Sequence, residues 1–315
     1  MLVQDTQEHG AAAAEAAHGA AEKFDAGDVI IRHVANSSID EPLIHLPTIL
    51  GIDFSITKHV FMLWLVAATV FVVVTWVVRR YLRQDRLIPS GFMNGLEAVV
   101  EFVRDEIVQP NVGKKWVGTW APLILTIFCF ILGANAIGLI PIFDVLGLID
   151  HYVLHTGEHS FIKQLLHGGT TATANFNVTA ALATVTFGAI IVAGVKAHGF
   201  VKHWMNLVPS GLAWPIYILL IPIEVMGMFV RPFALTMRLA ANMTGGHIAI
   251  LAILSFVFLF AEMGGALAGI GAGLAVSVPL AVGISALEII VVLVQAYVFT
   301  LLTAVFIGMA IHVHH

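Results

Sequence analysis

Ionisable and amide side chains occur in the C-terminal third of this 315-residue sequence, within stretches that are otherwise apolar. The first stretch, residues 212–262, has no clear polar break, and a second stretch covers residues 275–311. A charged side chain inside a membrane-spanning segment is costly, and it is a functional candidate by default. The candidates are Glu224, Arg231, Arg238, Asn242 and His247 in the first stretch, and Glu288, Gln295 and Tyr297 in the second.

Helical spacing places several of these side chains on a common face of the first stretch. Glu224, Arg231 and Arg238 are seven residues apart, so they share one face to within about 40° of drift. Asn242 follows Arg238 by four residues and shares this face. His247 follows Arg238 by nine residues, so it lies on the opposite side of the helix.

A hairpin of the two stretches would bring candidates from each to matching depths. The Gly-rich segment 263–273 separates them and predicts a turn. Counted from its centre, Arg238 and Gln295 are about equally distant, and so are His247 and Glu288. We expect Gln295 to hold the Arg238 side chain without neutralising it. We expect His247 and Glu288 to form a titratable pair, in which the carboxylate favours the imidazolium.

Such an arrangement suits ion transfer with a barrier. Arg238 keeps its charge because a guanidinium does not deprotonate in proteins. A fixed positive charge midway through a membrane repels protons and attracts a carboxylate that arrives without its proton. Titratable groups lie on both sides, with Glu224 on one and His247 and Glu288 on the other. This pattern predicts two aqueous half-paths that do not join, so that a proton crosses only on a mobile carboxylate of a partner.

Each of these residues also has a structural alternative. Arg238 could be capped by backbone carbonyl groups. Arg231, just before a proline, could lie at a kink and pair with Glu224. His247 and Glu288 could be no more than a packing pair. A purely structural membrane anchor, however, leaves the intramembrane charges unexplained.

The composition indicates an integral membrane protein. Hydrophobic residues make up 59% of the chain and charged residues only 11%, whereas a soluble domain is about a quarter charged. The mean hydropathy is +0.93. The single cysteine, Cys129, excludes a disulfide framework and a cysteine-based metal site.

The apolar segments predict an all-α membrane protein with about five membrane-crossing helices in a single domain, residues 41–311. The last two would measure at least about 46 Å and 54 Å as helices, well over the ~30 Å hydrocarbon core. We therefore expect two long, steeply tilted helices forming a hairpin; the alternative is more, shorter helices with re-entrant breaks. The predicted spans are about 60–78, 119–143, 175–195, 212–262 and 275–311.

Between the first two spans, residues 91–116 are too charged to cross the membrane, but apolar residues recur there at helical spacing. This predicts an amphipathic helix at the cytoplasmic interface. Basic segments follow the first and third spans, at 79–86 and 196–203, and the positive-inside rule places them in the cytoplasm. The polar N-terminal tail, residues 1–40, is then outside, and the C-terminal tail, residues 312–315, is cytoplasmic.

Four segments of the sequence resemble subunit a of the F-type ATP synthase, in the same order. The most specific are RPFALTMRLAANMTGGH (231–247) and LEIIVVLVQAYVFTLLTAVFI (287–307). PLILTIFCFILGANAIGLIP (122–141) and ANFNVTAALA (174–183) resemble earlier spans of that subunit. The resemblance covers about residues 40–311.

The resemblance implies a role for each candidate. Arg238 is the essential stator arginine, facing the ion-carrying carboxylate of the rotating c ring, and Asn242 and Gln295 support it. His247 and Glu288 belong to the inlet half-channel. Some family members carry these two side-chain types in exchanged positions, which keeps the chemistry of the pair.

Other positions are implied with less specific roles. Glu224 lines the cytoplasmic exit, while Asn135 and Asn175 are possible inlet lining or only satisfy helix ends. Arg231 and Tyr297 are further possible channel lining. Some family members carry an acid where Gly138 aligns, so that lining role is absent from this chain.

The implied partners are the c ring, the b subunits of the peripheral stalk, the other ATP synthase subunits and the lipid bilayer of a bacterial inner membrane. We expect no catalysis by this chain alone, no cofactor or metal and no nucleic acid partner. The rival hypothesis is a metal-ion membrane transporter, because His151, His155 and His159 are four residues apart and could bind a metal on one helical face. It would need ligands at membrane depth, whereas nearly all the histidines are in predicted loops or tails.

Overall fold

The computed structural model describes residues 27, 30, 31, 44, 46, 47, 55–83, 91–139, 172–206 and 214–312. This part of the chain is helical, with no β-structure beyond one isolated bridge between Ile44 and Ile56. Five helices in it are long and apolar enough to cross a membrane. The predicted all-α membrane architecture is therefore confirmed. The predicted N-terminal tail and the histidine-rich loop lie almost entirely outside the described residues.

The first membrane-crossing helix is α3, Lys58–Leu82, and it packs against α6, Val117–Leu139. The amphipathic segment between them consists of α4 (Phe92–Glu101), the π-helix η1 (Phe102–Val108) and α5 (Gln109–Val112). Its apolar residues Val103, Ile107, Val108 and Val112 are buried against α6 and α13. This face explains why a segment too charged to cross the membrane still packs on the bundle.

Helix α9, Phe176–His198, is bounded by local sequence signals at both ends. It follows the short 3-10 helix η3, Ala172–Ala174, and at its start the Asn175 side chain accepts a 2.8 Å hydrogen bond from the Asn177 N–H. At its end Gly199 has φ 86°, a value that favours glycine, and the chain changes direction into α10, Phe200–Met205.

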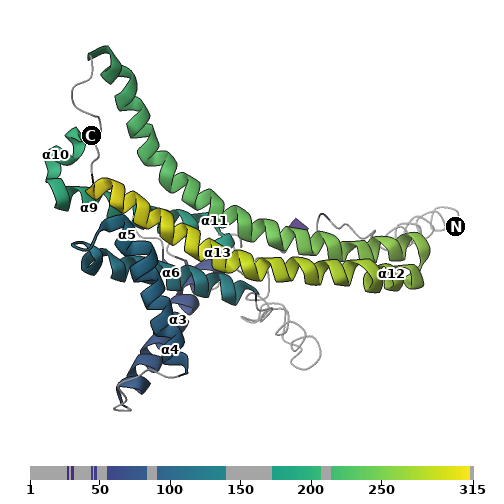
Figure 1. Ribbon diagram of the computed structural model, residues 1–315. Helices are drawn as coiled ribbons and strands as arrows, with labels where there is room; N and C mark the ends of the chain where they lie inside the picture. The colour runs from purple at the N-terminus through teal and green to yellow at the C-terminus, as the bar shows by residue number, and fades with distance from the viewer. Residues whose placement is uncertain are drawn as a thin grey trace, which may run out of the picture.

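The last two long elements form an antiparallel hairpin (Figure 1). Helix α11, Trp214–Gly264, is continuous over 51 residues, about 76 Å at the usual helical rise. It curves along its length, and Pro222 and Pro232 lie inside it (Figure 1). The other limb comprises α12 (Ala266–Ala272), the π-helix η4 (Gly273–Ser277) and α13 (Val278–Ile311). The predicted hairpin of two long helices is confirmed.

The turn of the hairpin is much tighter than the sequence suggested. A turn was predicted over 263–273, but the chain reverses at Gly265, where φ is 79°, and α12 begins at the next residue. The glycine that follows in α12, Gly269, serves close packing instead. A Cβ atom built on it would lie 2.5 Å from the Ala261 Cβ and 2.8 Å from the Val257 carbonyl oxygen.

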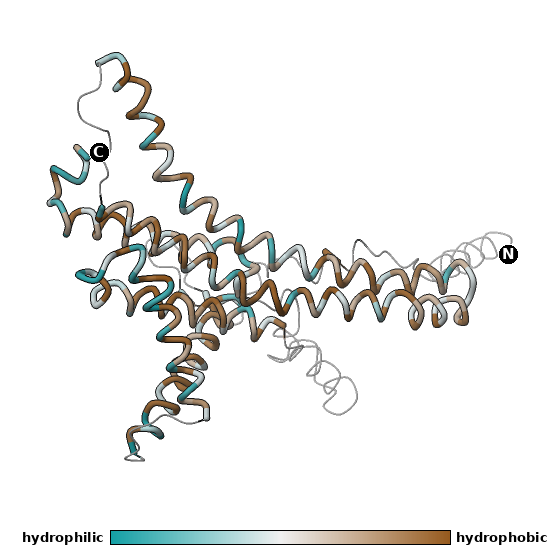
Figure 2. Tube along the Cα trace, viewed as in Figure 1, coloured by the Kyte–Doolittle hydropathy of each residue, from teal (hydrophilic) through white to brown (hydrophobic). Residues whose placement is uncertain are grey.

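Helix α13 is the central element of the bundle, because it packs against α5, α6, α9 and α11. The residues of α11 and α13 are mostly apolar on all sides of each helix, and hydrophilic residues occur only at isolated positions along them (Figure 2). A helix that is apolar all round must be covered by protein or lipid. The first part of α11 diverges from the other helices (Figure 1), so its exposed apolar side chains are left for lipid or a partner.

We expect Gly269→Leu to destabilise the hairpin and Gly271→Leu to leave it unchanged. Position 269 has no room for a side chain, whereas a Cβ at position 271 meets nothing within 4 Å. Overpacking of this kind typically costs about 1–3 kcal/mol. Thermal unfolding of the two purified variants in detergent measures the difference. Equal midpoints for both variants would contradict the close packing of the limbs.

Candidate functional site

Arg238 lies on the surface of α11 at the edge of the face that packs into the bundle. Leu235 and Leu239 are 2% and 0% exposed and hold this turn of the helix against its neighbours. Arg238 itself is exposed. Within the described ranges its guanidinium makes no ion pair and no hydrogen bond. Neither backbone capping nor a partner within this part of the chain therefore accounts for its charge.

Asn242 and Gln295 connect the two limbs beside Arg238. The Asn242 Nδ2 group donates a 2.9 Å hydrogen bond to Gln295 Oε1. Gln295 is 3% exposed, and its buried Nε2 group has no hydrogen-bond partner among the described residues. The sequence predicted that Gln295 holds Arg238, but its carbonyl oxygen binds Asn242 instead. Arg238 therefore remains free of the hairpin's own polar contacts.

His247 and Glu288 are brought together, as their matching depths predicted. The Glu288 side chain packs directly on Gly246: a Cβ built there would overlap its Oε1 atom and lie 2.9 Å from its Cδ atom. The His247 ring is near enough to interact electrostatically with the Glu288 carboxylate. Both residues are half-buried. Glu288 therefore lies beside the Gly246–His247 segment, on the side of Arg238 nearer the turn.

The π-helical turn η4 affects which residues meet across the hairpin. Near the turn Gly269 packs on Ala261, and this pairing continued along two straight α-helices would set Glu288 opposite Asn242. Glu288 lies instead against Gly246, which is nearer the turn. A π-helix uses more residues per turn than an α-helix, so the limb that contains η4 advances less per residue. Glu288 therefore meets a residue of α11 nearer the turn than two straight α-helices would allow.

Asn135 and Asn175 lie near one another at the ends of α6 and α9. Asn135 is fully buried, and its Oδ1 atom accepts a 2.6 Å hydrogen bond from Thr173 Oγ1. Asn175 caps α9, which fulfils the structural role considered from the sequence. The Asn135 Nδ2 group is buried without a hydrogen-bond partner. The two asparagines therefore differ, since only Asn135 retains an unused buried donor.

Glu224, Arg231 and Tyr297 do not join the cluster around Arg238. Glu224 is half-buried in the N-terminal part of α11, two helical turns before Arg231. The suggested ion pair between Arg231 and Glu224 does not form; the Arg231 Cζ atom lies 5.6 Å from the centre of the Phe306 ring. Two helical turns separate the pair along α11, which is why an aromatic ring across the bundle is the nearer partner. Tyr297 is 38% exposed, and the centre of its ring lies 5.9 Å from the centre of the Phe102 ring.

The sequence matches the ATP synthase A chain family over residues 60–308, most of its length. This chain belongs to the ATP synthase subunit a family. A relative from Chlorobium luteolum, ATP synthase subunit a 2, is 40% identical, with 98% of this chain and 88% of the relative covered. ATP synthase subunit a 2 from Prosthecochloris aestuarii is 39% identical, with 94% and 82% covered. ATP synthase subunit a from Chlorobium phaeobacteroides is 40% identical, with 96% and 81% covered.

Membership of the subunit a family explains the five candidate spans, because this subunit is a membrane component of a proton-translocating F-type ATP synthase. The bacterial relatives and the apolar helices together indicate a multi-pass protein of a bacterial inner membrane. The chain thus takes part in ATP synthesis and proton transport as one component of a larger complex.

Two threonines beside the site were not among the candidates that the sequence of this chain indicated. Thr173 binds Asn135, and the Thr244 hydroxyl lies 3.5 Å from the Ala174 carbonyl oxygen, which it can reach as a donor. Thr244 is three residues before His247, so η3 lies beside α11 at the level of the titratable pair. Threonine is common in apolar helices and carries no charge, and its spacing here gives no signal that would have identified it.

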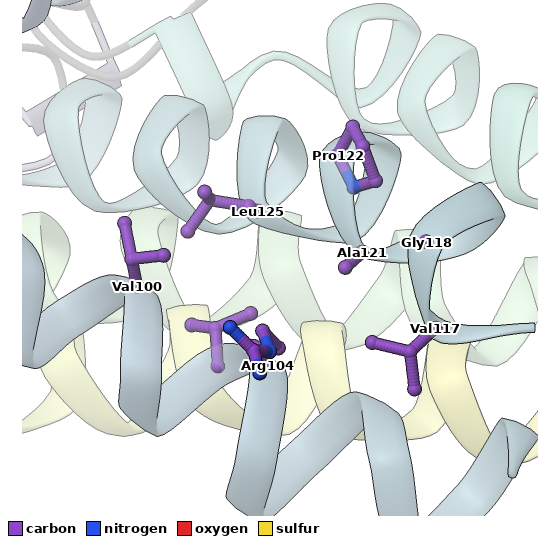
Figure 3. Close-up of a pocket in the computed structure, with 8 residues that line it drawn as sticks. Val100, Arg104, Val117, Gly118, Ala121, Pro122 and Leu125 are labelled. Atoms are coloured by element: carbon purple, nitrogen blue, oxygen red, sulfur yellow. The ribbon is translucent and has the colours of Figure 1, made fainter. Parts of the chain in front are cut away.

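A cavity of about 530 Å³ lies between the amphipathic segment and the start of α6 (Figure 3). Arg104 projects into it from η1, opposite Pro122 and Leu125 of α6 (Figure 3). The rest of the lining is apolar. Arg104 forms an ion pair with Asp105, with 3.2 Å between its Nε atom and the Asp105 Oδ1 atom. None of the predicted site residues lines this cavity, so it is separate from the cluster around Arg238.

We expect Gly246→Ala to slow ATP-driven proton pumping by the assembled synthase, and Gly245→Ala to leave it unchanged. A methyl group at position 246 displaces the Glu288 carboxylate, whereas one at position 245 meets nothing within 4 Å. A displacement of about 1 Å can cost on the order of 100-fold in rate, and we expect a loss of at least 10-fold. Proton uptake into vesicles measures the rate. Equal rates for both variants would contradict a role for the Glu288 position.

Proposed function

We propose that this chain is the proton-conducting stator subunit of its ATP synthase, and that Arg238 faces the ion-carrying carboxylate of the c ring. The exposed position of Arg238 carries the proposal. Its guanidinium has no partner within the described residues, and its exposed neighbours on α11 include the apolar side chains of Phe233 and Met237. A charge in this setting is costly unless an anion from another molecule meets it.

The side chains next to Arg238 support a close approach by a partner helix. Ala234 is four residues before it and Ala241 three residues after, and both are exposed. Small residues at such spacing allow helix backbones to come near one another in membranes. A carboxylate on the facing helix could then reach the guanidinium, which binds carboxylates through two parallel hydrogen bonds.

Two half-channels follow from the groups on either side of Arg238. His247 and Glu288 form the end of the inlet half-channel, about 13 Å along the helix from Arg238. Asn135, Thr173 and Thr244 would line it at the level of this pair, where the buried Asn135 amide retains a donor that no described residue uses. These polar groups are the kind that water or a proton relay requires at membrane depth.

Glu224 lies on the other side of Arg238, about 21 Å along α11, and would line the exit half-channel toward the cytoplasm. The proton then passes from Glu288 to the ring carboxylate, travels with the rotating ring, and leaves near Glu224. Arg238 prevents a direct passage because it stays positively charged and repels protons. Arg231 and Tyr297 remain candidates for additional lining only.

The energetics require such a pooled mechanism. One charge moving through 100 mV yields about 2.3 kcal/mol, which is too little to form one phosphoanhydride bond. Several protons must therefore contribute to each ATP, and a rotor combines their work mechanically. The Gly-rich segment GIGAG at 269–273 does not match a phosphate-binding loop, since no Lys-Ser/Thr pair follows it. We further propose contacts with the b subunits of the stalk, an external N-terminus and a cytoplasmic C-terminus.

The rival hypothesis of a metal-ion transporter receives no support from the membrane-spanning part. Within residues 55–83, 91–139, 172–206 and 214–312, no group of three His, Cys, Asp or Glu side chains could hold a metal ion. His151, His155 and His159 lie outside the described residues.

Replacement of Arg238 by Ala is expected to abolish ATP-driven proton pumping by the assembled synthase. The barrier between the half-channels and the partner of the ring carboxylate are both lost. Arg104→Ala, which removes an exposed arginine outside the site, should pump normally and serves as the control. Acidification of vesicles on addition of ATP is the measurement. Normal pumping by the Arg238 variant would refute the assignment.

For Glu288→Gln we expect slower proton flow through a complex that still assembles. The amide keeps the size of the side chain against Gly246 but cannot take up and release a proton. General acid–base groups typically contribute about 100-fold or more to a rate. Passive proton flux and the subunit content of the purified complex are measured together. Loss of assembly would show that Glu288 is structural rather than part of the proton path.

A further inference from the structure

A groove of about 600 Å³ follows the C-terminal half of α3, on a helix that bears none of the proposed proton-path residues. Its lining residues come mostly in adjacent pairs that repeat every four positions, so they share one face of the helix. The groove is apolar at one end and basic at the other. It is lined by Phe71, Val72, Thr75, Trp76, Arg79, Arg80 and Arg83.

The basic end concentrates positive charge, and no acid is among the described residues that line it. Arg79, Arg80 and Arg83 are exposed and lie within five positions. Like charges three and four residues apart on a helix repel one another. Within the described part of the chain none of the three makes an ion pair or a hydrogen bond, although Arg80 lies 5.3 Å from the Trp76 ring centre. Bound anionic charge would relieve this repulsion.

The apolar end continues the same face into the predicted membrane span. Phe71, Val72 and Trp76 are 70%, 60% and 54% exposed. From Phe71 to Arg79 the face extends about 12 Å along the helix, enough to lie beside the upper part of an acyl chain. Trp76 is at the junction of the apolar and basic ends. Tryptophan side chains are enriched at membrane–water interfaces, so this position fits the boundary between acyl chains and headgroups.

We propose that this groove binds an anionic phospholipid, with its phosphate on Arg79, Arg80 and Arg83 and an acyl chain along Phe71 and Trp76. Guanidinium groups bind phosphate oxygens through paired hydrogen bonds, and the stacking of Arg80 on Trp76 orients one of them in advance. Basic clusters at the cytoplasmic end of a membrane helix attract anionic lipids by the same charge.

Charge distinguishes this groove from the other described cavity. The Arg104 cavity is also partly apolar, but its arginine is bonded to Asp105, and Glu101 and Glu106 are close in sequence. Its local charge is therefore not positive enough to select an anion. The described lining of the α3 groove combines three guanidinium groups, and no acid, with an apolar end, which matches both parts of a phospholipid.

The test compares two triple variants of the purified full chain that lose the same charge. In the first, Arg79, Arg80 and Arg83 become Gln; in the control, Arg104, Lys114 and Lys115 become Gln. Native mass spectrometry follows the binding of phosphatidylglycerol against phosphatidylcholine. At about 1 kcal/mol for each basic residue, the first variant should bind phosphatidylglycerol on the order of 100-fold more weakly. The control should bind within about twofold of the unmodified chain, and excess inorganic phosphate should not displace the lipid.

Equal binding by the unmodified chain and the first variant would overturn the proposal, and so would displacement by inorganic phosphate. If the first variant fails to insert, the triple Lys variant at the same positions keeps the charge that orients α3. It should bind about 10-fold more weakly, because Lys lacks the paired donors of Arg; unchanged binding would again overturn the proposal.

A second measurement in the assembled synthase identifies the occupant. A photo-cross-linking phenylalanine analogue at position 71 should form an adduct with the mass of a phospholipid. An adduct with another subunit instead would show that a protein helix covers the groove and would overturn the lipid assignment. Neither measurement depends on proton pumping, so the outcome is independent of the proposed function.

Discussion

A guanidinium without a partner among the described residues, on a largely apolar surface, is the feature on which the rest of this structure depends. Arg238 is exposed on α11, and the hairpin's own amide groups bind each other rather than its charge. Desolvation of a bare charge is too costly to be incidental. The surface therefore makes physical sense when another molecule supplies the counter-charge. The ring carboxylate that we propose as this partner would neutralise the arginine and then move away from it.

The hairpin holds this surface in place through close packing at glycines. Gly265 reverses the chain in one residue, Gly269 allows α12 to lie on α11, and Gly246 makes room for the Glu288 carboxylate. Gly269 and Gly246 accept a close neighbour because they have no Cβ, whereas Gly265 adopts the positive φ that the turn requires. The polar residues thus meet at depths set by the packing of the limbs, with the Asn242–Gln295 bond fixing the level next to Arg238.

The charged residues of α11 and α13 are arranged differently from the arginines of α3. On α11 and α13 single charges are separated along the membrane depth, which suits transfer of an ion from one group to the next. On α3 three arginines gather on one face, with no acid among the described residues that line the groove, which suits retention of an anion. The first arrangement needs a moving partner and the second a resident one, such as the phospholipid proposed here.

The sequence alone determined the all-α membrane class, the five spans, the long hairpin and the meeting of His247 with Glu288, because apolar length and helical spacing are local properties of the chain. It could not determine the one-residue turn at Gly265, the π-helical turn η4, or that Gln295 binds Asn242 and Arg231 lies over Phe306. Those outcomes depend on which side chains face each other across packed helices. A shift of one helical turn changes every such pair without changing the apolar pattern, so only the tertiary structure decided them.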